Sequence, residues 1–319
     1  MMTQFLGEKK VMFERARVLS VAVAACIAAG TGGTSSDAAA QSRLDNIKRD
    51  KKIVIGVRES TPPYGFTDKD GNRVGWTIDL GKALKGIIEK KLGVELALEL
   101  KPVTPQTRIP LVVNGTIDAY FGSAGKSIER EEVIDFSLIT NAVCVKKLVA
   151  KNSAIRETKD LAGQRVGVTQ GSLEERLLNT MSADGRIKPA VRVVPFDKHS
   201  TGFIALSQGK TDAHVTMDDA LLTLAAASPN PSEWEVRGPD IFCTVSGIIV
   251  QENDSNWRDM IDHSLCYFIM TGGYDRLYAE WFSGPNAKAG YERALSSEVL
   301  FMIRNQCPDG AERFLQAAK

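Results

Sequence analysis

Short apolar runs of strand length alternate along the chain with stretches whose apolar residues recur every three to four positions. Ile53–Val57 is a continuous apolar run, whereas Leu80, Leu84 and Ile87 keep the spacing of one helix face, which Gly93 is placed to end. By these criteria, strands are predicted at residues 53–57, 96–100, 118–121, 136–145, 165–168, 191–195, 213–217 and 246–250. Helices are predicted at residues 80–92, in a short segment closed by residues 114–115, and at 172–181, 200–209, 220–227, 257–270 and 274–281.

The order of these elements predicts an α/β fold. Regular alternation of strand and helix is typical of largely parallel sheets, and here it occurs twice before the chain returns with a last strand. We therefore predict two lobes, the first formed by residues 41–145 and 245–319 and the second by residues 146–244, joined by two hinge strands. Pro231 and Gly238-Pro239 predict a loop before the returning strand.

The N-terminal residues 1–40 have the layout of a secretory signal peptide. Four basic residues precede an apolar run at residues 18–29, and small residues follow up to Ala40. The run is too short to span a bilayer, so we predict cleavage near Ala40 and a periplasmic protein. A lipid anchor on Cys26, in the lipobox-like stretch Val23–Cys26, is the weaker alternative because the preceding apolar run is short.

The charge of the chain is balanced. The chain has 319 residues, of which 43% are apolar, and this is enough for two domains with their own cores. Charged residues make up 25% of the chain. The chain has 40 Lys and Arg against 39 Asp and Glu; residues 1–40 hold four and three of these, so 36 of each remain. A neutral chain gives no reason to expect nucleic acid or a membrane surface as partner.

Four cysteines remain after residue 40, and none forms a Cys-x-x-Cys pair. The three histidines also lack metal-ligand spacing, so we predict neither a metal site nor a cofactor. In an exported protein the cysteines are candidates for disulfides. We favour a Cys266–Cys307 bridge that clips the C-terminal segment, and a Cys144–Cys243 bridge follows if those two strands are neighbours.

The segment Gly122–Ser137 has the pattern of a carboxylate-binding loop. A predicted strand ends in Gly-Ser-Ala-Gly, which exposes backbone N–H groups and the Ser123 hydroxyl, and Arg130 follows seven residues later. The planar guanidinium of arginine suits a carboxylate. A surface turn followed by a solvated helix start is the plainer interpretation of the same residues.

Two further arginines stand where α/β sheets bind ligands. Arg58 directly follows the predicted strand at residues 53–57 and precedes a proline-rich loop in which no regular structure is expected. Arg108 opens a short helix, where the dipole disfavours a cation unless an anion is near. Solvent exposure, or for Arg58 a pair with Glu59, explains them equally well from the local sequence.

The second predicted lobe adds helix N-termini and polar groups. Ser172–Glu175 fits a capping box, so Ser172 is first an N-cap and second a ligand residue. Asp218 and Asp219 precede an apolar helix; we expect one to be its N-cap and the other to be free to meet a cation. His199 stands at the opening of another helix and can donate a hydrogen bond when suitably bonded or protonated.

The charges of these residues indicate an acidic ligand. A free amino acid needs a cation for its α-carboxylate and an anion for its α-ammonium group, which Arg130 and one of the two aspartates supply. Arg58 and Arg108 then remain, and desolvating them beside a neutral ligand is costly. A second carboxylate on the ligand removes that cost, so we predict binding of glutamate or aspartate.

The chain resembles the periplasmic solute-binding proteins of polar amino-acid ABC importers, and among them the glutamate/aspartate-binding proteins. The resemblance spans nearly all of residues 43–305 and rests on stretches that are specific in their order and spacing. They are Gly56–Ser60, Thr107–Leu111 with Asn114-Gly115, Gly122-Ser123, Ile128–Arg130, Asp135–Ser137 and Met217–Leu222. It implies a type II, Venus-flytrap fold and delivery of the amino acid to a membrane permease–ATPase complex.

The resemblance also implies roles for single residues. Arg130 matches the arginine that binds the α-carboxylate, and Asp218 with Ser123 matches the partners of the α-ammonium group. The positions that hold the side-chain carboxylate in acidic-amino-acid binders match Arg58, Arg108 and His199.

Three departures from the subfamily leave alternatives open. Pro105, Gly125 and Leu173 stand where hydroxyl residues are usual, which would weaken affinity or shift the preference toward glutamine, asparagine or another polar amino acid. A secreted enzyme similar to cyclohexadienyl dehydratase would use the same scaffold, with Glu59, His199 or Asp219 as acid or base. No GxSxG, HExxH or P-loop motif supports catalysis. We expect a monomeric binder rather than an enzyme or an extracellular sensor module.

Overall fold

The computed structural model describes residues 42–316, so the predicted signal peptide and the Cys26 alternative lie outside the described residues. Eight strands form one mixed sheet in the order β5-β1-β6-β11-β7-β10-β8-β9, and three short strands form a second sheet in the order β2-β3-β4. The strands are β1 (Lys52–Val57), β2 (Ser60–Thr61), β3 (Gly65–Thr67), β4 (Arg73–Val74), β5 (Ala97–Pro102), β6 (Ala119–Tyr120), β7 (Ile134–Ala150), β8 (Arg165–Thr169), β9 (Arg192–Phe196), β10 (Ala213–Met217) and β11 (Trp234–Gln251).

Helices flank the strands, and most begin where the apolar periodicity predicts them. Gly93 ends α2 with a φ of 67°, the left-handed conformation expected of it. The helices are α1 (Arg43–Asp50), α2 (Trp76–Leu92), α3 (Arg108–Val113), α4 (Ile128–Glu131), α5 (Leu173–Ala183), α6 (His199–Ser207), α7 (Asp218–Ala226), α8 (Ser255–Met270), α9 (Gly273–Phe282) and α10 (Ser297–Asn305). Short 3-10 turns cover Thr158–Leu161, Pro231–Glu233 and Ala311–Arg313.

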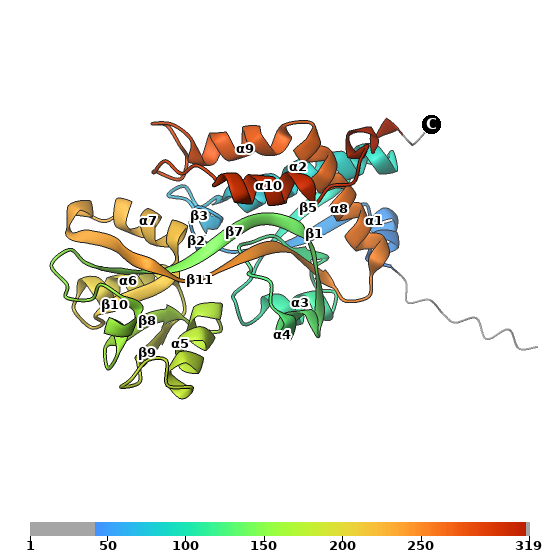
Figure 1. Cartoon of the computed structure of the whole chain (residues 1–319). Helices are drawn as coiled ribbons and strands as arrows, with labels where there is room; N and C mark the ends of the chain where they lie inside the picture. Colours follow the sequence, from blue (N-terminus) through green and yellow to red (C-terminus); the bar gives the residue numbers. More distant parts are fainter. Residues whose placement is uncertain (1–41, 317–319) are drawn as a thin grey trace, which may run out of the picture. The chain divides into compact units, whose positions relative to one another are not determined.

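The two long strands β7 and β11 connect the two ends of the large sheet. They pair antiparallel from Trp234 opposite Ala150 to Gln251 opposite Ile134, and in Figure 1 they run side by side through the middle of the view. Strand β6 pairs with β11 and continues to β1 and β5, whereas β10 pairs with β7 and continues to β8 and β9. Both long strands extend well beyond the predicted segments at residues 136–145 and 246–250.

Two loop predictions were wrong. Strand β11 continues through Gly238-Pro239, and its register shifts between Arg237 and Phe242, which lets the strand accommodate a proline without an N–H group and a glycine at φ 75°. After β1, Ser60–Thr61 also forms the short strand β2, so regular structure does not end at Val57; the two prolines occupy the turn between β2 and β3.

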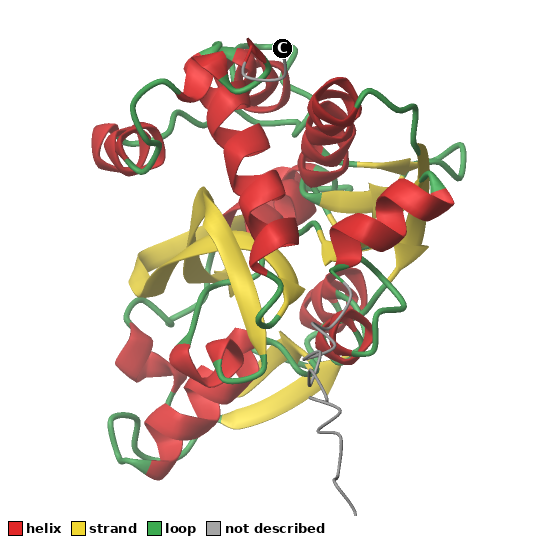
Figure 2. Cartoon of the chain, turned by 90° about the vertical axis from the view of Figure 1, so that its right-hand side faces the viewer, coloured by secondary structure: helices red, strands yellow, loops and turns green. Residues whose placement is uncertain are grey.

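Each group of strands has its own apolar core. The larger core lies where α2, α8 and α9 pack on β1, and it contains the fully buried Trp76 and Trp257. A separate cluster around β8 and β10 contains Val166, Val168 and Val215, each fully buried. Figure 2 shows helices in red packed around the yellow strands in both groups. Within residues 42–316, no helix is long and apolar enough to cross a membrane.

Both predicted disulfides are formed. Cys266 in α8 is bonded to Cys307, which follows α10 and ties the C-terminal segment to the larger core. Cys144 and Cys243 face each other on β7 and β11, with their Cα atoms 4.1 Å apart. The condition stated for this second bridge, that its two strands be neighbours, is therefore confirmed.

Candidate functional site

A cavity lies where strand ends and helix starts of both strand groups meet. Arg58 follows β1, Thr169 ends β8 and Met217 ends β10, so the cavity takes its residues from the carboxyl ends of these strands. Six of the seven predicted site residues line it, namely Arg58, Arg108, Ser123, Arg130, Ser172 and His199. The other lining residues are Thr61, Pro105, Tyr120, Gly125, Val143, Val145, Thr169, Leu173, Glu174 and Met217.

The three arginines of the cavity are buried and have few partners. The exposed fraction is 4% for Arg58, 6% for Arg108 and 4% for Arg130. Arg58 Nε donates to Thr61 Oγ1 at 3.0 Å, and Arg130 Nη1 donates to the Gly125 carbonyl at 2.5 Å. Within residues 42–316, no carboxylate lies within 4 Å of any of the three guanidinium groups, and the Arg108 guanidinium donates no hydrogen bond there.

Burial changes the protonation energetics of these cations. Desolvation, with the nearby Arg108 and Arg176 charges adding to it, lowers the pKa of Arg130 to about 9. Burial likewise lowers the pKa of Arg58 from its ordinary value. Both side chains remain protonated at pH 7, so the cavity holds positive charge whose cost an anionic ligand would relieve.

Ser172 has the capping role expected of it. Its Oγ accepts a hydrogen bond from Glu175 N at 3.2 Å at the start of α5. The reciprocal half of the predicted box differs, because the Glu175 carboxylate accepts from Gly171 N at 2.5 Å rather than from Ser172 N. Ser172 thus holds the N-terminus of α5 at the edge of the cavity that it also lines.

His199 lies at the first position of α6 and is almost fully buried. Its Nδ1 is 2.8 Å from Thr169 Oγ1. Burial, together with the positive charge of Arg58 and the neighbouring His214, moves the pKa of His199 well below its ordinary value. The ring is therefore neutral at pH 7, and it can contribute one hydrogen-bond donor and one acceptor rather than a charge.

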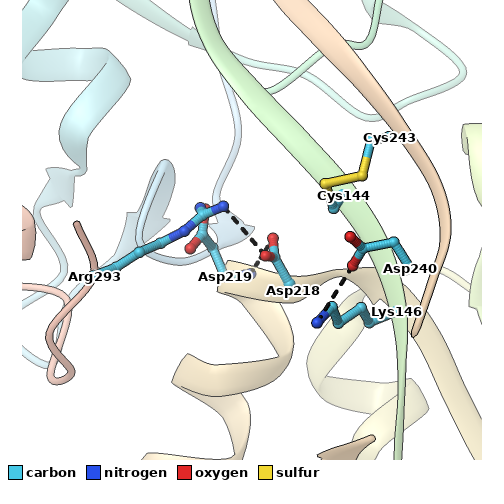
Figure 3. The surroundings of a disulfide bond; sticks show 7 residues. All are labelled: Cys144, Lys146, Asp218, Asp219, Asp240, Cys243 and Arg293. Atoms are coloured by element: carbon cyan, nitrogen blue, oxygen red, sulfur yellow. Dashed lines mark hydrogen bonds and ion pairs between the residues drawn. A yellow bond between two sulfur atoms is a disulfide. The ribbon is translucent and has the colours of Figure 1, made fainter. Parts of the chain in front are cut away.

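Asp218 is the one predicted site residue that is not among those lining the cavity. Arg293 Nη2 donates to Asp218 Oδ2 at 3.2 Å, and Arg293 Nη1 bonds the neighbouring Asp219 (Figure 3). Burial and the adjacent Asp219 charge raise the pKa of Asp218 to about 6. The expected N-cap role was wrong for both residues, since α7 begins at Asp218 without a side-chain cap.

Glu174 belongs to the cavity and was not predicted from the sequence. It is the second residue of α5, is 4% exposed, and accepts a hydrogen bond from Thr216 Oγ1 at 2.8 Å. Burial raises the pKa of its carboxyl group, whereas hydrogen bonds from its own backbone N–H and from Thr216, and then the charges of Arg108 and Arg130, act to lower it. A sequence signal was available, because only Glu175 is needed for the capping box and Glu174 is then an acidic residue without an assigned function.

The chain belongs to the bacterial extracellular solute-binding proteins, family 3, whose model matches residues 53–284. It is 31% identical over 273 residues to the glutamate/aspartate import solute-binding protein of Salmonella typhimurium, covering 84% of this chain and 89% of that protein. It is 30% identical over 284 residues to the ABC transporter glutamine-binding protein of Bacillus subtilis, covering 88% and 100%.

Solved structures show the same fold. An ancestral arginine-binding protein bound to arginine superimposes with a TM-score of 0.65 and 33% identity, over 73% of this chain and 98% of that chain. The family and the α/β, two-lobe fold class expected from the sequence are confirmed by these relatives.

Proposed function

We propose that this protein is the extracytoplasmic substrate-binding component of an amino-acid ABC importer. It binds glutamate or aspartate in the cavity and delivers the amino acid to a permease–ATPase complex in the inner membrane. The family and the named relatives support the transport role. Residues 1–40 direct its export to the periplasm, where it acts as a monomeric binder rather than as an enzyme.

The cavity lies between two lobes that move about β7 and β11. Residues 41–145 and 245–319 form the first lobe, and residues 146–244 form the second. This division is supported by the separate apolar cores of the two strand groups. Open and closed arrangements exchange, and the ligand stabilises the closed one in proportion to its better fit there.

The observation that carries the acidic preference is the charge that lines the cavity. Three buried arginines line the cavity together with one buried glutamate and a neutral histidine, so the basic side chains outnumber the acidic ones by two. Glutamate and aspartate carry a net negative charge and two carboxylates for the arginine forks. Glutamine adds no net charge, and arginine adds one more positive charge to the excess, so both leave more buried charge uncompensated than an acidic amino acid does.

An amide ligand is the second candidate. The glutamine-binding relative matches the chain over nearly its whole length. Three lining residues have no side-chain hydrogen-bonding group: Pro105, Gly125 and Leu173. Their side chains therefore make no hydrogen bond that would favour a ligand carboxylate over an amide.

The deciding experiment is isothermal titration of the purified protein with glutamate, aspartate, glutamine, asparagine and arginine. Bound amino acid is first removed by unfolding in denaturant and refolding with both disulfides intact. Tight binding confined to the two acids is the expected result. Preference for an amide would refute the acidic assignment, and absence of binding across the panel would favour an enzyme on this scaffold.

The Arg108→Ala variant tests the charge reasoning directly. Removing a charge-assisted contact to a ligand carboxylate costs about 1.5–3 kcal/mol, or roughly a 10- to 150-fold loss of glutamate affinity. Arg192→Ala is the matched control, because Arg192 is an exposed residue of β9 that does not line the cavity. Unchanged glutamate affinity in Arg108→Ala would contradict the proposed clamp.

A further inference from the structure

One tyrosine, which no sequence pattern singled out, lines the candidate site. Tyr120 ends β6, where its backbone pairs with Gly56 of β1 on one side and with Ile249 of β11 on the other. Its side chain is almost fully buried, and it lines the same cavity as the three arginines. The sheet therefore holds Tyr120 in a defined place beside the ligand space.

The ring of Tyr120 supports one of the buried arginines. The Arg108 guanidinium carbon lies 5.4 Å from the ring centroid, which is within the range of a cation–π contact. Arg108 donates no hydrogen bond among the described residues, and its Nε atom is completely buried. Because both side chains line the cavity, the ring keeps this guanidinium beside the ligand space.

The hydroxyl of Tyr120 lies against the Gly-Ser-Ala-Gly loop. A Cβ atom at Gly122 would collide with Tyr120 Oη, so the glycine leaves the room that the hydroxyl occupies. Within residues 42–316, no hydrogen bond joins this hydroxyl to another residue. Buried tyrosine hydroxyls usually have a partner, and leaving one without a partner costs free energy. Because Tyr120 lines the cavity, a ligand bound there can supply the missing acceptor.

The charges near this hydroxyl favour a carboxylate as its acceptor. Arg58 and Arg130 lie close enough to Tyr120 that a charge on its hydroxyl would act on both. With Arg108 against the ring, three positive groups are therefore near the tyrosine. These groups attract an anion, and a hydrogen bond to an ionised acceptor is about twice as strong as one to a neutral acceptor.

We propose that the Tyr120 hydroxyl donates a hydrogen bond to the side-chain carboxylate of the ligand and thereby favours an acidic amino acid over its amide. The side-chain carboxylate is the acceptor because Arg108, which contacts the ring, is expected to bind that group. The proposal rests on the proposed function, since it assumes an acidic amino acid in the cavity. It gives Tyr120 the discriminating hydrogen bond that Pro105, Gly125 and Leu173 do not offer.

The test is titration calorimetry of the wild type and Tyr120→Phe with glutamate and with glutamine. The variant keeps the ring beside Arg108 and removes only the hydroxyl. Glutamate affinity is expected to fall roughly 10- to 150-fold. Glutamine affinity is expected to fall only about 2- to 10-fold, because the amide forms a neutral hydrogen bond with the hydroxyl. The readout is the ratio of the two affinities, since a general change of cavity shape lowers both.

Tyr278→Phe is the matched control. Tyr278 lies in α9, and its buried hydroxyl also has no hydrogen-bond partner among the described residues, but it is not one of the residues that line the cavity. Both affinities of this variant are expected to equal those of the wild type. Ligand-free Tyr120→Phe should also melt at the wild-type temperature and gain less stability from added glutamate. A lower melting temperature without ligand would count against a hydroxyl that is reserved for the ligand.

The outcomes separate this proposal from the proposed function. Unchanged glutamate affinity in Tyr120→Phe overturns the role of the hydroxyl, while the acidic preference stands. An equal loss for glutamate and glutamine overturns the assignment to the side-chain carboxylate, because both ligands share the α-carboxylate. A wild type that prefers glutamine to both acids refutes the acidic preference. The assignment of Tyr120 then stands only if Tyr120→Phe still loses more affinity for glutamate than for glutamine.

Discussion

Arg293 is expected to contribute strongly to stability through the carboxylates at the start of α7. It follows α9 in the C-terminal segment and bonds Asp219 and Asp218. Asp219 also accepts hydrogen bonds from Tyr64 and Tyr291. This network therefore joins the C-terminal segment and the β2–β3 turn to the helix that follows β10.

The magnitude follows from burial. Asp219 is completely buried, whereas the Arg293 side chain is 22% exposed. Removing one partner of a buried ion pair costs about 3–5 kcal/mol because the other charge is left uncompensated, and the partial exposure of Arg293 favours the lower end, about 3 kcal/mol. At about 2–4 °C per kcal/mol for a chain of this size, the melting temperature should fall by roughly 6–12 °C.

The assay is urea and thermal unfolding of Arg293→Met, which keeps most of the aliphatic stem and removes the charge. Arg304→Met is the matched control, because the Arg304–Asp275 pair is about half exposed on both sides and should cost less than about 1 kcal/mol. Adding Asp219→Asn to Arg293→Met should restore part of the loss, since no unpaired charge is then buried. Equal destabilisation by Arg293→Met and Arg304→Met would refute this reasoning.

Two other variants test features of the same core. Burial raises the pKa of Asp262 from 3.8 to about 6, so folding binds a proton between these values and the stability due to this group is lost as pH rises from about 4 to about 6. Asp262→Asn should remove that decline. The unfolding free energy of the variant minus that of the wild type, measured in urea, should therefore be higher at pH 8 than at pH 4 by on the order of 2 kcal/mol. A difference that is the same at both pH values would contradict this expectation. Cys307→Ser opens a bridge between residues 41 positions apart and should cost about 4 kcal/mol by the chain-entropy estimate, measured against the wild type without reductant. A melting temperature equal to that of the wild type would count against a stabilising clip.

The positions of the cavity arginines could be predicted because local patterns mark them. Arg58 follows an apolar run of strand length that ends at a proline-rich stretch, and Arg108 opens a helix whose end is marked by Asn114-Gly115. Burial at these points follows from the sheet, whose strands end at the same edge. The paired disulfide positions were likewise accessible, since only four cysteines had to be combined.

Long-range pairing was not accessible in the same way. Arg293 lies 75 residues from Asp218, and no periodicity or motif indicates that the two meet. The full length of β11 was hidden by Gly238-Pro239, because a local pattern cannot show that a register shift will accommodate them. Glu174 was overlooked for a different reason: its neighbour Glu175 satisfied the capping pattern, and no local pattern indicates that Glu174 accepts a hydrogen bond from Thr216, 42 positions further along the chain.

The bridge between Cys144 and Cys243 makes the segment between them a covalent ring. Its two ends are 99 positions apart in sequence and directly opposite each other on β7 and β11. A single cut by a protease anywhere inside this ring leaves both pieces attached to the rest of the molecule. Two cuts are needed to release a fragment, so a nicked chain runs as one species on a non-reducing gel and separates only after reduction.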